Sequence, residues 1–511
     1  MLKSNSQPDS LYSAEQAREL DRIAMTDFGL KDGVLMERAG LAAFQLLRFC
    51  WPRARKLLVV AGPGNNGGDG FVLARLAITL GYKVKLIATV APDHYKGDAG
   101  KALKGLQESL QATGGTILNS IHELETDTTY SGRADVIVDA MFGIGLDRQP
   151  GGDYLAIINW INDQDSPVLA IDIPSGLHAD TGSILEQAVQ ANATISFIGL
   201  KTGLVTGRGP QVCGQLYFHD LDLPQAVYEN IEPVARTVSV RNISHLPFLQ
   251  RDTHKARQGH VLVLGGDKSM AGAAAMAGQA AYRCGAGLVR VLCHETSLTQ
   301  VSFSPEIMVT GTSDKTPIPK NVFAKANALV LGPGLGQRPW GLSLFSKALD
   351  QESLPMVVDA DGLRWLAANP QYRHNWVLTP HAGEAAALLG VNTIIIESDR
   401  LLAARQISEK YGGSCILKGA GSVITDAAED QVRIVRAGNP GMATGGMGDV
   451  LSGIIAALMG LGLSPFNSAV TGAWIHGNAA DQAAIVMGER GLMATDLFKT
   501  IPEQMARLEQ N

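Results

Sequence analysis

Continuous apolar runs alternate with segments of helical periodicity along most of this chain. Ser13 followed by Gln16 is the pattern of a capping box and predicts the start of a helix. That helix is expected to end at about Gly29, and a second helix is expected over residues 33–49. The period then changes, because the apolar run KLLVVAG, the helical segment FVLARLAITLG and the strand-like run KVKLIATV follow in order. This β-loop-α-β unit implies a parallel sheet.

Further apolar runs continue the alternation in two series. ADVIVDA, PVLAIDIP and ATISFIGL extend the first series, which predicts a doubly wound α/β domain over residues 1–225. Residues 226–250 contain prolines and scattered polar residues without long periodicity, as expected of a linker. HVLVLGG opens the second series, in which single strands are predicted at LVRVLCH, NALVLGPGLG, PMVVDADG, WVLTPHAG and SCILKGAGSVIT. No sequence repeat relates the two series, so residues 251–511 are expected to form a different α/β domain, and both domains should carry their sites at the carboxyl ends of strands.

Composition narrows the classes of partner. Hydrophobic residues make up 46% and charged residues 18% of the 511 residues, and the formal net charge is −6. A surface for nucleic acid or for an anionic membrane normally needs a basic face, so small molecules are the expected partners. The longest strongly apolar stretch, residues 450–463, contains Gly and Ser and is shorter than the roughly 20 residues that cross a bilayer. It therefore predicts a buried helix.

The amino-terminal segment and the cysteines favour a cytoplasmic protein. MLKSNSQPDSLYSAEQARELDR is polar and acidic and resembles neither a signal peptide nor an arginine-rich transit peptide. The five cysteines form no CxxC pair, and we expect them to be small buried hydrophobic residues in a reducing compartment.

A glycine-rich loop follows the first predicted strand of the doubly wound series and opens directly into a helix. Glycine lets backbone amides approach a ligand phosphate at the positive end of a helix. The loop has neither the GxGxxG fingerprint nor the Gly-Lys-Ser/Thr of a P-loop, and the alternative is a tight turn in which Asn and Gly adopt left-handed geometry. Its residues are Gly62-Pro63-Gly64-Asn65-Asn66-Gly67-Gly68-Asp69-Gly70.

Two carboxylates end later strands of the same domain. Asp139 ends one apolar run, and Asp172 ends another, just before the turn that holds Ser175. Such strand ends line the ligand crevices of α/β sheets, although a single Asp there is often a cap for the next helix. A second glycine-containing loop, Gly143-Ile144-Gly145-Leu146-Asp147-Arg148, follows the strand of Asp139, and Arg148 could add a charged contact to a phosphate.

Three motifs of the first domain resemble a known family. GPGNNGGDG, VDAMFGIGLDR and AIDIPSGL, in this order and spacing, are similar to the YjeF N-terminal domain, the NAD(P)H-hydrate epimerase family. The resemblance implies a Rossmann-like fold, Asp172 at the reacting centre, and a potassium ion bound by Asn66, Asp139 and Ser175, whose oxygens suit a hard cation. Some similar domains serve instead as scaffolds or partner-binding modules. The contacts that the resemblance implies with a damaged nicotinamide dinucleotide are Asn65, Asn66, Gly67, Gly68, Asp69, Gly143, Ile144, Gly145, Leu146, Asp147, Arg148, Gln149 and Asp172.

The strongest signal for chemistry lies in the second domain, before its apolar helix. The segment Asn439-Pro440-Gly441-Met442-Ala443-Thr444-Gly445-Gly446-Met447-Gly448-Asp449 is rich in glycine. Glycines free the backbone to form a ring of amide donors at a helix N-terminus, which can stabilise charge on a transferring phosphoryl group. Asp449 lies at the same end and can accept the proton of an attacking hydroxyl; the alternative is that it merely complements the helix dipole.

Other predicted strand ends of the second domain carry further candidates. Lys418-Gly419-Ala420-Gly421-Ser422 offers a cation, a hydroxyl and a glycine turn suited to nucleotide phosphates, with a bare hairpin turn as the alternative. Gly332-Pro333-Gly334-Leu335-Gly336 and Thr379-Pro380-His381-Ala382-Gly383-Glu384 occupy two more strand ends. His381 taken alone would more often be a structural histidine.

The second domain also resembles a known family. GGDKSMAGAA, LGPGLG, LTPHAGE, LKGAGS and GGMGDVLSG are similar to the YjeF C-terminal domain, the ribokinase-like, ADP-dependent NAD(P)H-hydrate dehydratase family. The resemblance implies that the hydrated dinucleotide contacts Ala274, Gly334, His381 and Asp449. A divalent ion, Mg²⁺, is expected to neutralise the nucleotide charge. The ADP contacts that the resemblance implies are Lys418, Gly419, Ala420, Gly421, Ser422 and Gly448.

Together the two resemblances imply a single repair function. The first domain would interconvert the R and S epimers of hydrated NADH and NADPH, termed NADHX and NADPHX. The second domain would dehydrate the S form at the expense of ADP, giving NAD(P)H, AMP and phosphate. The alternative is a small-molecule hydroxymethyl kinase whose first domain only binds a ligand. We expect a homo-oligomer with no nucleic-acid or membrane partner.

Overall fold

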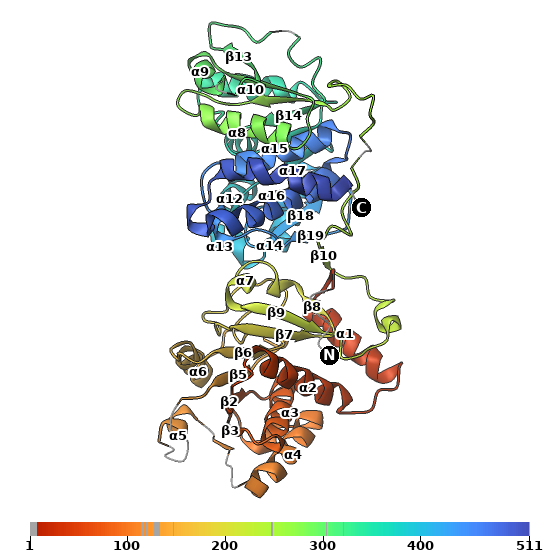
Figure 1. The fold of residues 1–511 in the computed structure, drawn as a ribbon, viewed down its shortest axis with the longest axis vertical. Helices are drawn as coiled ribbons and strands as arrows, with labels where there is room; N and C mark the ends of the chain where they lie inside the picture. The colour runs from red at the N-terminus through yellow and green to blue at the C-terminus, as the bar shows by residue number, and fades with distance from the viewer. Residues whose placement is uncertain are drawn as a thin grey trace. The chain divides into compact units, whose positions relative to one another are not determined.

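The computed structural model describes residues 8–113, 117–118, 120–126, 133–146, 148–246, 249–302, 304–319 and 321–509. The chain forms two compact units, Met1–Arg236 and Thr237–Asn511, each with its own parallel sheet flanked by helices (Figure 1). This confirms the α/β class. The boundary between the units falls within residues 226–250, which contain the short strand β10 (Ala235–Thr237).

Two helices precede the first strand of the doubly wound sheet, as the sequence predicts. They are α1 (Ala14–Thr26) and α2 (Val34–Cys50). Ser13 Oγ accepts a hydrogen bond from the Gln16 amide at 3.1 Å, and Gln16 Oε1 accepts one from the Ser13 amide at 3.2 Å. The predicted capping box is therefore confirmed, and it fixes the start of α1.

The sheet of the first unit is parallel throughout and has helices on both faces. Leu57 and Val59 point toward the helices α2, α3 (Asn65–Thr79) and α4 (Gly97–Thr113), whereas Leu58 and Val60 pack with α6 (Asp153–Asn162). This alternation is the period of a strand that is buried on both faces, so the doubly wound prediction is confirmed. In sheet order the strands are β4 (Ile117–Leu118), β3 (Lys83–Ala88), β2 (Lys56–Ala61), β5 (Val136–Ala140), β6 (Val168–Ile171), β7 (Ala193–Phe197) and β9 (Gln215–His219).

The order of these strands locates a ligand crevice. The chain winds outward from β2 through β3 to β4, then returns to β5 beside β2 and winds the other way. Doubly wound sheets bind ligands beyond the carboxyl ends of strands at such a reversal. The loops after β2 and β5 therefore flank the position where a ligand is expected.

The sequence pattern did not reveal several short elements of the first unit. The strand β1 (Ser10–Tyr12) pairs in parallel with β8 (Leu200–Lys201) and antiparallel with β10. The helices α5 (Ile121–Thr126) and α7 (Gly209–Val212) and the edge strand β9 were also not predicted. β8 is important for the site, because it carries Lys201.

The second unit has a sheet that is parallel over most of its width. Its strands, in sheet order, are β13 (Met308–Thr312), β12 (Leu288–His294), β11 (His260–Leu264), β14 (Ala328–Leu331), β15 (Met356–Val358), β16 (Trp376–Leu378), β17 (Ser414–Leu417), β18 (Ser422–Asp426) and β19 (Arg433–Val435). Neighbours from β13 to β17 are parallel, and β18 and β19 continue the sheet in antiparallel fashion.

One prediction for this sheet is wrong. The segment SCILKGAGSVIT was expected to form a single strand, but it forms the antiparallel pair β17 and β18. Gly419 and Gly421, with φ of +155° and +64°, reverse the chain between them. Glycine adopts these angles without steric cost, so the two glycines turn one apolar run into a hairpin.

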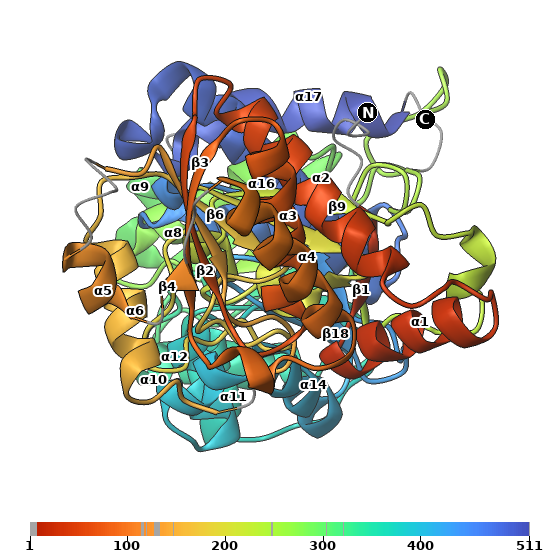
Figure 2. The same cartoon turned by 90° about the horizontal axis from the view of Figure 1, so that it is seen from below.

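Helices cover both faces of the second sheet. Figure 2 shows α10 (Pro339–Leu349), α11 (Asp361–Ala368), α12 (Ala382–Leu389) and α14 (Arg400–Tyr411) on the side of the unit opposite to α17 (Leu497–Glu509). The helix α16 (Pro465–Met487) packs against α17. The helices α8 (Ala271–Arg283) and α15 (Met447–Gly460) share a core with α16 and α17. The shorter helices are α9 (Leu298–Val301) and α13 (Thr393–Ser398).

The apolar helix predicted over residues 450–463 is α15, and it is buried in this core. Ile454, Ile455 and Leu458 are fully inaccessible to solvent. In the part of the chain that the structure describes, no helix combines the length and the apolar character needed to span a membrane.

Candidate active sites

The predicted phosphate loop of the first unit is the entrance to α3. Its first helical residues are Asn65–Asp69, and the N-cap Gly64 offers no side chain to the free amides of the first turn. A Cβ at Gly62 would lie 1.8 Å from the carbonyl oxygen of Met141, and one at Gly67 would lie 2.0 Å from the Gly62 carbonyl oxygen. No residue from 62 to 70, all of them described, has a positive φ, so the left-handed geometry expected for a tight turn here is wrong, although the turn itself is tight. The glycines bring the helix N-terminus against the strand ends and leave its amides open to an anion.

Asp172 follows β6 and is held in a buried ion pair. Its φ of +64° is unusual for a residue other than glycine, and its amide donates to the Ile195 carbonyl oxygen at 2.7 Å. Asp172 Oδ1 lies 2.5 Å from Lys201 Nζ, and the two side chains are only 13% and 3% exposed. Lys201 Nζ also donates to Ser196 Oγ at 3.2 Å and to the Phe197 carbonyl oxygen at 3.0 Å. These contacts fix the carboxylate at the carboxyl edge of the sheet.

Two more carboxyl groups belong to this charge cluster. Burial raises the pKa of Asp69 well above its usual value, and the charges of Asp172 and Asp21 add to the rise while Lys201 opposes it. Burial also raises the pKa of Asp21, on α1, to about 6, with Lys201 opposing and Asp172 reinforcing the effect. One lysine thus lies among three carboxyl groups, and burial disfavours the ionised forms of Asp69 and Asp21.

The predicted potassium residues lie together next to this cluster. Asp139 is fully buried, and its carboxylate accepts hydrogen bonds from Ser175 Oγ at 2.6 Å and from the Ser175 amide at 2.8 Å. Burial raises the pKa of Asp139 to about 6, although these hydrogen bonds oppose the rise. Asn66 Nδ2 donates to the Phe142 carbonyl oxygen at 2.9 Å, while Asn66 Oδ1 is buried without a hydrogen-bond partner among the described residues.

The loop after β5 approaches the same place. A Cβ at Gly143 would lie 3.4 Å from Asp172 Oδ2 and 3.5 Å from Asn66 Cβ, so the structure brings these three predicted residues together. Ile144, Gly145 and Leu146 continue the turn, and Arg148 and Gln149 are exposed. Asp147 lies outside the described residues.

The predicted base of the second unit lies in the first turn of α15. The N-cap Gly446 has a φ of +93°, and Asp449 follows it within that turn. Burial raises the pKa of Asp449 to about 7, Asp359 reinforces the rise, and Lys418 opposes it. A carboxylate with this pKa is matched to proton transfer at neutral pH.

Lys418 lies between two carboxylates of the second site. Its Nζ lies 2.9 Å from Asp359 Oδ1 and 3.7 Å from Glu384 Oε2. Burial opposes the charge of Lys418, yet these two carboxylates raise its pKa above the usual value. Burial likewise opposes the charge of Asp359, but Lys418 and hydrogen bonds that include one from Ser452 Oγ at 2.8 Å hold the pKa of Asp359 below its usual value. A Cβ at Gly448 would lie 3.3 Å from both Lys418 Nζ and Asp359 Oδ2, so Gly448 allows α15 to begin beside this pair.

The hairpin that carries Lys418 and the turn that carries His381 are joined by a backbone bond. The Lys418 amide donates to the Pro380 carbonyl oxygen at 2.8 Å. Ser422 Oγ donates to the Gly419 carbonyl oxygen at 3.1 Å, which closes the turn Lys418–Gly419–Ala420–Gly421. His381 is the N-cap of α12, where Nδ1 accepts from the Gly383 amide at 3.0 Å, and the side chain is 59% exposed. His381 therefore has the structural role named as its alternative, that of a helix cap, and its Nε2 lies 3.6 Å from Glu384 Oε1.

Ala274 and Gly334 lie at neighbouring strand ends of the same sheet. Gly334 has a φ of +60°, and a Cβ there would lie 2.6 Å from the Met270 carbonyl oxygen and 3.4 Å from Ala273 Cβ. Ala274 is fully buried on α8, where its Cβ would lie 3.2 Å from a Cβ at Gly266. The structure thus gathers Gly334, His381, Lys418 and Asp449 along one edge of the sheet, while Ala274 supports that edge from within α8.

Sequence reasoning missed several residues of these clusters. Lys201 and Asp359 each directly end an apolar run, so the strand-end rule that found Asp139 and Asp172 could have found them. Glu384 lies in the motif LTPHAGE, where the sequence pattern alone does not distinguish it from a helix-capping residue. Asp21 lies on α1, where only its burial and its neighbours mark it as unusual.

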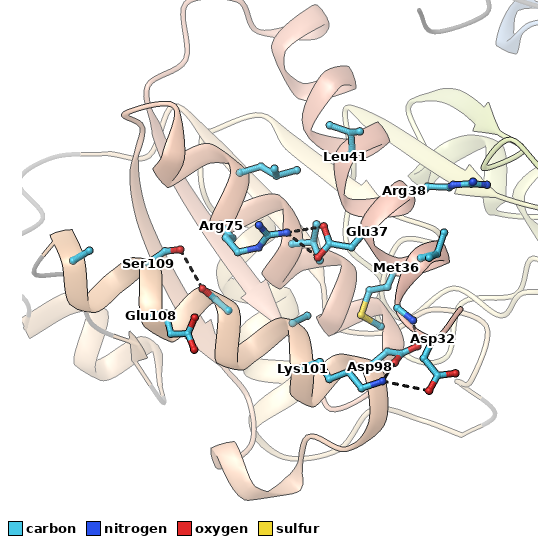
Figure 3. Close-up of a pocket in the computed structure, with 17 residues that line it drawn as sticks. Asp32, Met36, Glu37, Arg38, Leu41, Arg75, Asp98, Lys101, Glu108 and Ser109 are labelled. Carbon is cyan, nitrogen blue, oxygen red and sulfur yellow. Dashed lines mark hydrogen bonds and ion pairs between the residues drawn. The ribbon is translucent and has the colours of Figure 1, made fainter. Parts of the chain in front are cut away.

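A large groove of the first unit is separate from these residues. Its volume is about 1040 Å³, and it lies among α2, α3 and α4 (Figure 3). Several of its charged side chains form ion pairs: Arg75 contacts Glu37 at 2.6 Å, and Lys101 contacts Asp98 at 2.9 Å. None of the predicted site residues lines it.

Comparisons with known proteins agree over nearly the whole chain. The family model of NAD(P)H-hydrate dehydratase matches residues 261–503, and that of the YjeF-related protein N-terminus matches residues 32–203. The bifunctional NAD(P)H-hydrate repair enzyme Nnr of Escherichia coli (strain K12) is 43% identical over 497 residues, which are 97% of this chain and 93% of that protein. The Nnr enzyme of Coxiella burnetii is 42% identical over 96% of this chain and 98% of that protein.

A solved structure supports the fold of the second unit. A ribokinase-like superfamily protein from Enterococcus faecalis V583 matches with a TM-score of 0.50 and 26% identity, over 55% of this chain and 100% of that chain. With two family models on separate halves and relatives above 40% identity over the full length, the chain belongs to the family of bifunctional NAD(P)H-hydrate repair enzymes.

Proposed function

We propose that the second unit dehydrates the S epimer of hydrated NADH and NADPH at the expense of ADP, with Asp449 as the general base. The observation that carries this proposal is the pKa of about 7 that burial and Asp359 give to Asp449 at the N-terminus of α15. A carboxylate in this state can take a proton from a hydroxyl, and the adjacent free amides can bind a transferring phosphoryl group.

The reaction needs a good leaving group, because hydroxide leaves poorly. Asp449 accepts the proton of the C6 hydroxyl while the oxygen of that hydroxyl attacks the terminal phosphorus of ADP. The bond between the two phosphates breaks and AMP is released. The C6–O bond of the new phosphate ester then breaks with loss of a proton from C5, and the ring regains its double bond as NAD(P)H and phosphate. Lys418, held by Asp359, would neutralise phosphate charge beside the site of transfer.

A magnesium ion would accompany ADP in this step. In the described part of the chain no group of three His, Cys, Asp or Glu side chains is placed to hold a metal ion. Magnesium often keeps several waters and takes most of its other ligands from nucleotide phosphates, so it fits a site that supplies few protein ligands. Its charge would reduce the repulsion between the nucleotide and the incoming oxygen.

The first unit would supply the S epimer from the R epimer at the Asp172 cluster. Lys201 forms an ion pair with Asp172, whereas burial raises the pKa of Asp69 and raises that of Asp21 to about 6, which favours their protonated forms. Such a cluster holds a proton acceptor and a proton donor at one sheet edge, as inversion at the hydroxyl-bearing carbon requires. The open amides at the start of α3 would bind a phosphate of the dinucleotide.

The residues Asn66, Asp139 and Ser175 fit a potassium ion. The carboxylate of Asp139 is fully buried without a cationic side chain among its hydrogen-bond partners, and Asn66 Oδ1 is a buried oxygen with no described partner. A buried acceptor of this kind is costly unless a cation or a donor compensates it. When bound, potassium would supply charge balance at the loop that ends β5.

The rival function, a small-molecule kinase with a binding module, is separated from this one by a single assay. Purified protein is incubated with a mixture of the R and S forms of NADHX and with ADP or ATP. The proposal expects the near-ultraviolet absorbance of NADH to appear together with AMP and free phosphate when ADP is the co-substrate. A stable phosphorylated substrate without NADH would support the kinase instead.

A further inference from the structure

The turn that leads into α15 is attached to α16 by a carboxylate outside both predicted ligand sets. The Gly438 amide donates to Asp481 Oδ2 at 2.9 Å, and Asn439 Nδ2 donates to Asp481 Oδ1 at 2.9 Å. The two oxygens of Asp481 therefore hold the first residue of the segment Asn439–Asp449 and the residue before it. Hydrogen bonds to a charged acceptor are about twice as strong as neutral ones.

The attachment continues into the backbone of the turn. Asn439 Oδ1 accepts a hydrogen bond from the Gly441 amide at 3.1 Å, so the Asn439 side chain links Asp481 to the backbone at Gly441. A Cβ at Gly441 would lie 2.3 Å from the Glu489 carbonyl oxygen, and one at Gly477 on α16 would lie 2.6 Å from the Ala437 carbonyl oxygen. The turn is thus packed closely against α16 and the segment after it.

We propose that Asp481 is a positioning residue for phosphoryl transfer. It orients the turn at residues 439–446 so that the amides at the start of α15 and the carboxylate of Asp449 keep their places relative to the phosphates. This inference rests on the proposed dehydratase function. A displacement of reacting groups by about 1 Å can cost about a hundredfold in rate, so the contribution of Asp481 should be measurable in kcat.

The variant Asp481→Asn tests this role with little change in size. The carboxamide of Asn has one oxygen and one NH₂ group. Its NH₂ group would face one of the two groups that donate hydrogen bonds to Asp481, so at least one of these hydrogen bonds is lost. We expect kcat for dehydration of the S hydrate to fall about 10-fold to 100-fold. The KM for ADP should stay within about threefold, because the Lys418 hairpin that is proposed to hold ADP is untouched. Glu503→Gln, which removes an exposed carboxylate of α17, is the matched control and should keep the wild-type kcat.

A second variant distinguishes the loss of this attachment from a general folding defect. Asn439→Ala removes the hydrogen bond that Asn439 Nδ2 donates to Asp481 Oδ1, and the double variant with Asp481→Asn should lose less than the product of the two single losses, because both changes weaken the attachment of one turn to α16. Rates are referred to the folded fraction of the second unit, measured by thermal unfolding, and epimerase activity checks the concentration of intact protein.

The outcomes separate this inference from the proposed function. Wild-type kcat in both single variants, or losses that multiply in the double variant, would overturn the role of Asp481. A rise in the KM for ADP of both single variants with no change in kcat would also overturn this role. Failure of the wild-type protein to form NADH from the S hydrate and ADP would instead overturn the proposed function itself.

Discussion

Asp449 should make ADP-dependent dehydration depend on pH near neutrality. Burial raises its pKa from the usual 3.8 to about 7, with Asp359 adding to the rise. About one tenth of Asp449 is then ionised at about pH 6 and about nine tenths at about pH 8, so kcat/KM should rise about tenfold over this interval. The acid limb of the profile would report the free enzyme, since kcat/KM reflects ionisations before substrate binds.

The assay follows NADH absorbance with limiting S hydrate and saturating ADP from about pH 5.5 to about pH 9. The variant Asp359→Asn removes a carboxylate that raises the pKa of Asp449 and frees Lys418 to act on it, so both effects should move the rise to lower pH. Glu503→Gln serves again as the control with an unchanged profile. A kcat/KM that is flat between about pH 6 and about pH 8, or a rise that Asp359→Asn does not move, would refute the reasoning.

The same pKa has a consequence for stability with the opposite sign. Asp449 binds its proton more tightly in the folded than in the unfolded chain, so its ionisation costs about 4 kcal/mol of folding free energy above about pH 7, and the cost disappears below about pH 4. Asp449→Asn should therefore lower dehydration by about 10²-fold to 10⁴-fold and yet raise the thermal midpoint of the second unit at about pH 8, with a smaller gain at about pH 5. A slow variant that is also less stable than the wild type at about pH 8 would contradict a buried, destabilised base.

Three further outcomes test the remaining residues. Asp172→Asn should abolish conversion of the R to the S epimer, measured by chromatography of the two forms, and leave dehydration of the pure S form intact; unchanged conversion would exclude Asp172 from the reaction. If potassium binds through Asn66, Asp139 and Ser175, epimerase activity and substrate affinity should be higher in potassium than in sodium buffer, and Asn66→Ala should remove the difference; equal activity in both buffers counts against the site. Burial lowers the pKa of His476 from 6.5 to about 4. Between about pH 6.5 and about pH 4 the unfolded chain binds a proton at His476 that the folded chain does not, so the free energy of unfolding falls by about 3 kcal/mol over this interval. The stability lost on acidification should therefore be smaller in His476→Gln than in the wild type.

The positions of most site residues could be predicted because parallel sheets gather their functional groups at one edge. Apolar runs mark the strands, and a polar residue directly after a run marks the edge, as at Asp172 and in the turn of His381. The partners of these residues could not be obtained in this way. Lys201 is separated from Asp172 by 29 positions and Asp359 from Lys418 by 59, and they meet only through the order of the strands. Pair contacts of this kind depend on topology, which an apolar pattern does not specify.

The glycines show a second limit of the sequence pattern. The loop at residues 62–70 and the turn at residues 418–422 were interpreted as places where backbone approaches phosphate, but in the first unit Gly62 and Gly67 are required by the packing of α3 against the strand ends. In the second unit Gly419 and Gly421 reverse the chain with positive φ. Glycine serves close packing, chain reversal and ligand approach with the same absence of a side chain, so its presence alone does not tell which of these applies.

The two units reach a similar electrostatic arrangement on different sheets. In each, a lysine is shared by three carboxyl groups: the buried Lys201 by Asp172, Asp69 and Asp21, and the half-buried Lys418 by Asp359, Glu384 and Asp449. One positive charge cannot compensate three buried negative charges, so the ion pair forms with the nearest carboxylate and the pKa of another group rises toward neutrality. Substitution of either lysine would therefore be expected to raise the pKa of the remaining carboxyl groups further and to remove the ionised base, whereas substitution of the paired carboxylate would release the lysine to lower them. The direction of the shift in the pH profile, rather than the loss of activity, is thus the observation that distinguishes a tuned proton-transfer cluster from a purely structural ion pair.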